Sequence, residues 1–152
     1  MIQRIQTVYL LLITLLMGSM FFYPYAELLA QDNQIYSYSF NGLFLDGSEP
    51  VYFLTLPPAI LLSIIVLISF GTIFIFKNRI LQIRLSAINL MLMIGYVGLN
   101  YYYIKSFSNQ LTGVISYNII VIFPLISAIL GYLAIRAIGK DEALVRSLDR
   151  IR

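Results

Sequence analysis

The sequence predicts an all-α membrane protein: a four-transmembrane-helix bundle, with both termini on the inner side and a small β-hairpin in the first outer loop. Three observations predict this fold class. The 152 residues are 60% hydrophobic and only 11% charged, whereas soluble proteins carry about 25% charged residues. The charges are absent from four long stretches of the chain. The basic residues gather beside alternate ends of those stretches, as they do in membrane proteins.

Each charge-free stretch is long enough to cross a bilayer, since a spanning helix needs about 20 apolar residues. The stretches are residues 5–26, 50–76, 85–104 and 106–135. None shows the polar face that a helix of a soluble bundle would turn to water. We therefore expect one integral membrane domain, residues 1–152, with four transmembrane helices at about residues 5–26, 55–77, 84–104 and 115–137.

The first predicted span follows Arg4 and contains an apolar run from Ile5 to Tyr25. A signal peptide has an apolar region of about 7–15 residues and then a small-x-small cleavage site. This run is longer, and no clean cleavage site follows it. We expect an uncleaved transmembrane helix, and a cleaved signal peptide is the alternative.

The distribution of basic residues predicts the orientation, because Lys and Arg near the ends of spans stay in the cytoplasm. With the N-terminus inside, nine basic residues lie on the inner side and only Lys105 lies on the outer side. The nine are Arg4, Lys77, Arg79, Arg84, Arg136, Lys140, Arg146, Arg150 and Arg152. Both termini are therefore expected in the cytoplasm.

The first outer loop, residues 27–54, has the pattern of a β-hairpin at about residues 35–46. Tyr36, Tyr38 and Phe40 alternate with serines, and Asn41-Gly42, a preferred pair for a two-residue turn, follows. Pairing Phe40 with Leu43 across this turn places five apolar side chains on one face: Tyr36, Tyr38, Phe40, Leu43 and Leu45. We expect this face to rest on the helix ends or the lipid interface.

Tyr36, Tyr38, Phe40 and Leu43 are the candidate surface of this outer loop. Residues 51–53 are a candidate third strand, and an irregular aromatic loop is the alternative to the hairpin. The cytoplasmic tail, residues 140–152, has the pattern of a short amphipathic helix that Asp141 caps. Its basic face would contact anionic headgroups or a partner protein through Arg146, Arg150 and Arg152.

The composition excludes several kinds of chemistry. Without cysteine or histidine, the chain has no disulfides, no zinc site with Cys or His ligands and no imidazole base. No charged residue lies inside a predicted span, which argues against proton-coupled transport. Asp46 and Glu49 are spaced to bind a divalent cation weakly, but a solvated turn is the simpler interpretation. We expect no catalytic residue, metal, cofactor or nucleic-acid partner.

Neutral polar residues recur at helical spacing within the spans. Asn89, Tyr96 and Asn100 share one face of the third span. Gly18, Ser127 and Gly131 have the small side chains that let membrane helices approach closely. Packing between helices is the expected role of all six residues, and a small polar cavity lined by the first three is the alternative.

Both ends of the chain are similar to a known family. Residues 1–7 (MIQRIQT), which lead directly into a leucine-rich span, and the tail at residues 140–152 resemble a family of small four-pass bacterial membrane proteins with a domain of unknown function. This resemblance covers the whole chain and implies a bacterial cytoplasmic (inner) membrane protein, with no activity to transfer. Residues 40–44 also resemble the Gly-Leu-aromatic signature of claudin-type proteins, although the tryptophans and loop cysteines of that signature are missing.

Three classes of function follow from the sequence. The first is a non-enzymatic protein that acts through the lipid bilayer and a protein partner, or through self-association, by its outer aromatic loop or its basic tail. The second is a passive carrier or binder of a small molecule or lipid in a cavity between the helices. The third is an enzyme that modifies lipids at the outer leaflet, with Glu27, Asp46 or Glu49 as its acid.

Overall fold

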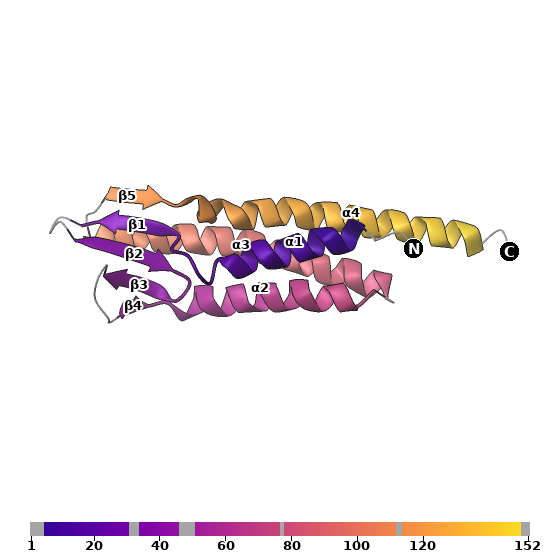
Figure 1. The fold of residues 1–152 in the computed structure, drawn as a ribbon, viewed down its shortest axis with the longest axis horizontal. Helices are drawn as coiled ribbons and strands as arrows, with labels where there is room; N and C mark the ends of the chain where they lie inside the picture. The colour runs from indigo at the N-terminus through magenta and orange to yellow at the C-terminus, as the bar shows by residue number, and fades with distance from the viewer. Residues whose placement is uncertain (1–4, 31–33, 46–50, 77, 112–113, 150–152) are drawn as a thin grey trace.

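The protein is mostly helical, with four helices and one small antiparallel sheet (Figure 1). This computed structural model describes residues 5–30, 34–45, 51–76, 78–111 and 114–149. Within these ranges the backbone alone is described for residues 51–53 and 144–149. The molecule is elongated: the helices lie side by side, the sheet lies at one end, and helix α4 extends furthest at the other end.

The helices form a closed four-membered bundle. Each helix packs against the next one in the chain, and α4 (Phe123–Asp149) packs against α1 (Ile5–Ser19), so the ring closes. The other two are α2 (Leu56–Phe74) and α3 (Arg79–Leu111). In the described residues, α2, α3 and the segment at residues 119–143 are long and apolar enough to cross a membrane, whereas α1 is apolar but shorter, with 15 residues.

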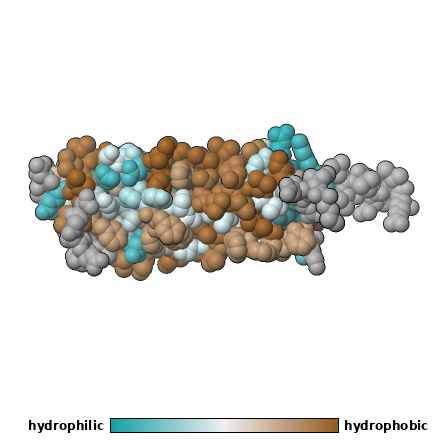
Figure 2. Space-filling view, in the orientation of Figure 1, coloured by the Kyte–Doolittle hydropathy of each residue, from teal (hydrophilic) through white to brown (hydrophobic). Residues whose placement is uncertain are grey.

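Most of the bundle surface is apolar. Large hydrophobic side chains are exposed on all four helices, for example Leu15, Leu67, Met91 and Ile129. In the space-filling view, hydrophobic residues dominate the middle of the molecule, and hydrophilic ones gather toward its two ends (Figure 2). A bundle with this surface has its lowest free energy in an apolar solvent, which is the expectation for a helix bundle in lipid.

The first helix ends earlier than expected. The sequence predicts a span at residues 5–26, but α1 stops at Ser19 and is followed by i→i+3 bonds such as Met20 N to Met17 O, 3.3 Å. Residues after Pro24 form a strand, β1 (Ala26–Leu29), instead. Proline disfavours helical geometry in the residue before it, and sheet hydrogen bonds then satisfy the backbone of this apolar segment.

The last predicted span, residues 115–137, also begins differently. Its first residues form strand β5 (Val114–Tyr117), then a 3₁₀ turn, η1 (Ile119–Ile122), and α4 starts only at Phe123. The backbone N–H of Asn118 donates to the carbonyl of Tyr25 at 2.9 Å, which ties this segment to the chain beside β1. A short apolar run suits a strand as well as a helix, so its sequence does not decide between them.

Helices α3 and α4 are longer than the predicted spans. The prediction of 84–104 was bounded by charged residues, yet α3 runs for 33 residues, past both Arg84 and Lys105. A charged residue is costly in lipid but is tolerated in a helix. A charge-free stretch therefore gives the length of chain inside the membrane and not the length of the helix. Likewise, α4 continues without a break through Gly139 to Asp149. The expected separate tail helix capped by Asp141 is therefore wrong.

The expected hairpin is confirmed and is part of a larger sheet. Strands β2 (Ile35–Ser39) and β3 (Gly42–Leu45) pair antiparallel, and β4 (Val51–Leu54) adds the third strand. The sheet order is β4-β3-β2-β1-β5. The two-residue turn is Phe40-Asn41 and not the predicted Asn41-Gly42, because Ser39 pairs with Gly42. Tyr38 pairs with Leu43, whereas the prediction paired Phe40 with Leu43. This shift by two residues leaves every side chain on its predicted face, because side chains alternate with period two.

Candidate functional site

The buried face of α3 organises both ends of the bundle. Its buried residues follow one another at spacings of three or four, which keeps them on one face of a helix. They are Gln82, Ser86, Asn89, Met93, Tyr96, Asn100, Ile104 and Phe107. The three predicted polar residues Asn89, Tyr96 and Asn100 thus lie on one buried face, as their spacing predicts.

At the end of α3 next to the sheet, hydroxyl and amide groups attach the sheet to the bundle. The Tyr38 hydroxyl of β2 donates to Oδ1 of Asn100 at 3.2 Å, and the Asn100 amide donates to the Tyr96 carbonyl at 2.9 Å. The Tyr25 hydroxyl donates to the carbonyl of Met20 at 3.1 Å and lies 2.9 Å from the Tyr96 hydroxyl. Since the single Tyr25 proton is used, Tyr96 donates to Tyr25. We call these four residues, Tyr25, Tyr38, Tyr96 and Asn100, the sheet anchor.

Aromatic packing completes the sheet anchor. The Tyr38 ring lies edge-on to Tyr25 and tilted to Phe107, with centroid distances of 5.6 Å in both pairs. Burial raises the pKa of Tyr38 well above its ordinary value near 10. The hydroxyl therefore stays protonated and acts as a neutral hydrogen-bond donor. This chemistry fixes the sheet in place and gives no general base.

Further from the sheet, Asn89 belongs to a separate contact. Its amide donates to the Ser69 hydroxyl of α2 at 2.6 Å, and the Gln82 amide donates to the Thr72 carbonyl at 3.2 Å. Met93 lies between Asn89 and the sheet anchor on the same face. A cavity of about 90 Å³ beside the sheet end of α3 is lined by Asn100 but by neither Asn89 nor Tyr96. The three predicted residues therefore do not line one cavity.

The structure also buries polar residues that the sequence analysis did not select. Gln6, Gln82 and Ser86 are buried, and each has a side-chain atom without a hydrogen-bond partner among the described residues. Gln6 begins the buried face of α1, with Leu10, Ile13 and Met17. The spacing of three and four residues selects Asn89 and Asn100. Followed to the helix ends away from the sheet, the same spacing also selects these three residues.

The candidate packing residues have different surroundings. A Cβ on Gly131 would lie 3.8 Å from Leu90 Cδ1 and 3.9 Å from Ile13 Cδ1, which are ordinary contacts between α4, α3 and α1. A Cβ on Gly18 would meet no described atom within 4 Å beyond its own helix, so no close approach requires a glycine there. Ser127 is fully buried in α4.

The predicted outer-loop surface is turned inward. Tyr36, Tyr38 and Leu43 are buried, and Phe40 packs edge-on against Phe21 with a centroid distance of 5.1 Å. The expectation that this apolar face rests on the helix ends is confirmed. The prediction of these four residues as the surface of the outer loop is wrong, because that packing removes their apolar face from water. The opposite face of the sheet is the exposed one.

That exposed face carries an aliphatic row at the end of the sheet furthest from the helix bundle. Leu29 pairs with Ile35 on one side and with Val114 on the other, so the three side chains lie side by side across three strands. Val114 is 73% exposed, Leu29 45% and Ile35 42%. This row could not be predicted from the sequence, because Leu29 and Ile35 were expected in a loop at residues 27–54 and only strand pairing brings Val114 to Leu29.

The remaining candidates can be placed only in part. Glu27 is exposed on β1, whereas Asp46 and Glu49 lie outside the described residues. Arg146 lies in the part of α4 whose backbone alone is described, and Arg150 and Arg152 lie outside the described residues. In the described part of the chain, no cluster of three or more His, Cys, Asp or Glu residues could hold a metal ion.

Comparison with known proteins gives a family and no activity. A family model for a domain of unknown function, DUF4293, matches residues 2–151. The expected resemblance to a family of unknown function is therefore confirmed over the whole chain. No curated protein matches the sequence. The claudin-type resemblance of residues 40–44 has no support in these comparisons.

Proposed function

Because this chain belongs to the DUF4293 family, a domain of unknown function, we propose its function from its structure. It is a non-enzymatic integral protein of the bacterial cytoplasmic membrane that binds a protein partner outside the membrane. The four helices hold the chain in lipid with both termini in the cytoplasm, and the sheet is the platform that presents the binding surface.

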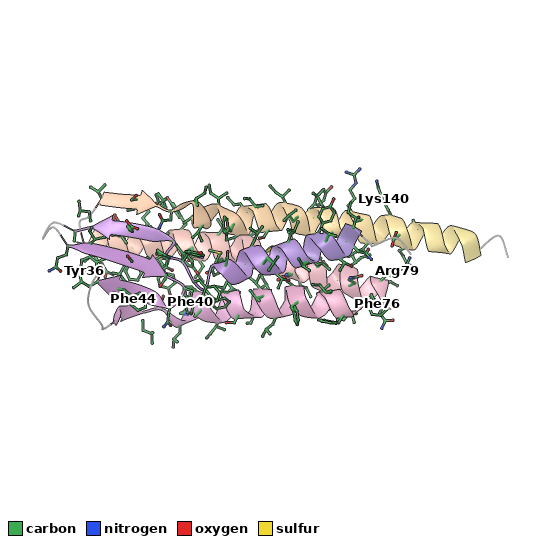
Figure 3. The ribbon with its side chains drawn as sticks, viewed as in Figure 1. Tyr36, Phe40, Phe44, Phe76, Arg79 and Lys140 are labelled. Carbon is green, nitrogen blue, oxygen red and sulfur yellow. The ribbon has the colours of Figure 1, made fainter. Side chains whose placement is uncertain are left out.

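The length of α3 supports this placement. About 20 residues of helix cross the hydrocarbon core, which is about 30 Å thick. Counted from Arg84, these residues end near Ile104, so the last turns of this 33-residue helix, to Leu111, extend beyond the lipid beside the sheet. Arg79 and Lys140 lie at the end of the molecule opposite Tyr36 and Phe44 (Figure 3). The basic end suits the cytoplasmic side, so the sheet is placed outside.

The observation that carries the partner proposal is the aliphatic row of Leu29, Ile35 and Val114. Lipid accounts for the apolar belt on the helices, but this row lies at the end of the sheet far from the bundle, where the surroundings are aqueous. Exposed apolar side chains that lie together outside the membrane are typical of protein-binding surfaces. The sheet anchor holds the row rigidly, which lowers the entropy lost on binding.

The non-enzymatic assignment rests on the chemistry of the site. The buried polar groups of the sheet anchor are neutral and hydrogen-bonded to one another. Glu27, the one of the three candidate acids that the structure describes, is exposed on β1. Such groups hold a fold together, and nothing in their arrangement activates a nucleophile.

Site-specific crosslinking in living cells tests the proposal. A photoreactive amino acid in place of Val114 should form one adduct of defined mass with an extramembrane protein, and Leu29→Glu should reduce that adduct at least fivefold. The same amino acid in place of Tyr102, which is exposed on α3, is the matched control and should not give this adduct. Failure to form the adduct at Val114, or its persistence in the Leu29→Glu variant, would refute partner binding by this row.

A further inference from the structure

A cavity between α3 and the irregular start of α4 lies at the outer boundary of the membrane. It has a volume of about 90 Å³. Val97, Tyr101 and Ile104 of α3 form one wall, and the opposite wall is formed by Tyr117, Val121 and Pro124. Because the chain forms strand β5 and turn η1 here instead of a helix, α4 leaves α3 uncovered at this level. We call this cavity the outer crevice.

The outer crevice opens to the bundle surface. Tyr101 is 57% exposed and Tyr117 is 53% exposed, so both rings lie at its mouth. Counting about 20 residues of α3 from Arg84, the last charge before the charge-free stretch, places Tyr101 and Ile104 at the outer edge of the hydrocarbon and Lys105 among the headgroups. Tyrosines are enriched at this depth, with the ring in the apolar layer and the hydroxyl among the headgroups.

The interior of the outer crevice suits hydrocarbon rather than water. Its two polar residues, Tyr25 and Asn100, use their side-chain groups in the sheet anchor. A water molecule needs two to four polar partners to be stable in a cavity, and apolar cavities stay dry or take apolar ligands. Since the mouth faces lipid, the apolar group available to fill the crevice is an acyl chain.

A positive charge lies directly above the mouth. Lys105 follows Tyr101 by one helical turn, and its Nζ lies 5.7 Å from the centre of the Tyr101 ring. Among the described residues, Lys105 forms no ion pair. It is also the one basic residue between Arg84 and Arg136. An ammonium group at headgroup depth attracts an anionic phosphate.

We propose that the outer crevice and Lys105 bind one anionic phospholipid of the outer leaflet. One acyl chain fills the space between α3 and η1, and the headgroup phosphate contacts the Lys105 ammonium beside Tyr101. The phospholipid closes the gap that the irregular start of α4 leaves in the bundle. This site is independent of the aliphatic row, which lies at the far end of the sheet.

Native mass spectrometry of the full-length protein in mild detergent tests the proposal, with phosphatidylglycerol and phosphatidylcholine of equal chain length as probes. The wild-type protein should retain one phosphatidylglycerol in preference to phosphatidylcholine. Lys105→Gln should lower the affinity for phosphatidylglycerol about fivefold, as expected for one basic residue near a headgroup, and leave phosphatidylcholine unchanged. Val121→Phe should fill the crevice and abolish retention of either lipid.

Met91→Phe is the matched control, because Met91 lies on the exposed face of α3 inside the apolar belt. This variant should retain lipid like the wild type. Near-ultraviolet circular dichroism of the tyrosines checks that each variant is folded, and Val97→Phe replaces Val121→Phe if the latter does not fold. Equal affinity for the two lipids, or retention that survives filling of the crevice, would overturn the proposal. Crosslinking at Val114 reports on the partner separately, so the two proposals fail independently.

Discussion

Tyr25 contacts three different segments of the chain. It donates to the Met20 carbonyl at the end of α1 and accepts from Tyr96 of α3, while its ring packs on Tyr38 of β2. Buried hydroxyls are costly without partners and stabilising with them. Each of these contacts uses a group that has no alternative partner in lipid, so one side chain helps to set the position of the sheet on the bundle.

We predict that Tyr25→Phe lowers the free energy of unfolding by about 1–3 kcal/mol, because it leaves the Tyr96 hydroxyl and the Met20 carbonyl buried without their partner. Tyr102→Phe changes an exposed ring on α3 and should have little effect. The two variants can be compared by denaturant-induced unfolding in detergent, followed by circular dichroism. Equal stability of both variants would show that the sheet anchor does not hold the sheet.

The sequence predicts which side chains share a face, but not the contacts that this face makes with other segments. The helical spacing of Asn89, Tyr96 and Asn100 was enough to place them on one buried face of α3. Their partners could not be predicted, because Ser69, Tyr38 and Tyr25 come from other segments. Val114 and Leu29 became neighbours only when their strands paired.

At the scale of elements, the charge-free stretches measure the part of each helix in lipid. This explains why α2 was predicted within a few residues, whereas α3 exceeds its stretch at both ends. The same measure cannot separate a strand from a helix in an apolar run, so Ala26 of β1 and residues 115–117 of β5 were predicted to lie in spans. The hairpin was predicted because a turn pair and period-two alternation both point to a strand.

Gly42, the first residue of β3 after the hairpin turn, gives a prediction at the scale of elements. Gly42 has a φ of 145°, a conformation that side chains with a Cβ rarely adopt. We expect Gly42→Ala to lower the free energy of unfolding by about 1–2 kcal/mol, because alanine is strained at positive φ.

Gly98→Ala is the control for this prediction, since a Cβ there meets no described atom within 4 Å beyond α3 itself. Alanine stabilises a helix by up to about 1 kcal/mol relative to glycine, so this variant should be as stable as the wild type or more stable. Thermal unfolding in detergent distinguishes the two effects. A Gly42→Ala variant with wild-type stability would contradict the described turn.

For the whole molecule, the absence of cysteine makes the proposed orientation easy to test. Single cysteines replace Val114 at the tip of the sheet and Lys140 near the opposite end of the bundle. In intact cells, a membrane-impermeant maleimide should label Val114→Cys, whereas Lys140→Cys should react only after the membrane is permeabilised. The reverse pattern, or labelling of both from outside, would contradict the proposed topology.

The sequence by itself determined the apolar surroundings of this chain, the number of its helices and the hairpin, because these depend on composition and on local periodicity. Only the tertiary structure decided that residues 26–29 and 114–117 are strands, that the predicted hairpin face is buried, and that an aliphatic row and a crevice are exposed. Local patterns state which side chains share a face. Whether that face is covered depends on segments distant in sequence, through the pairing of strands and the packing of helix ends.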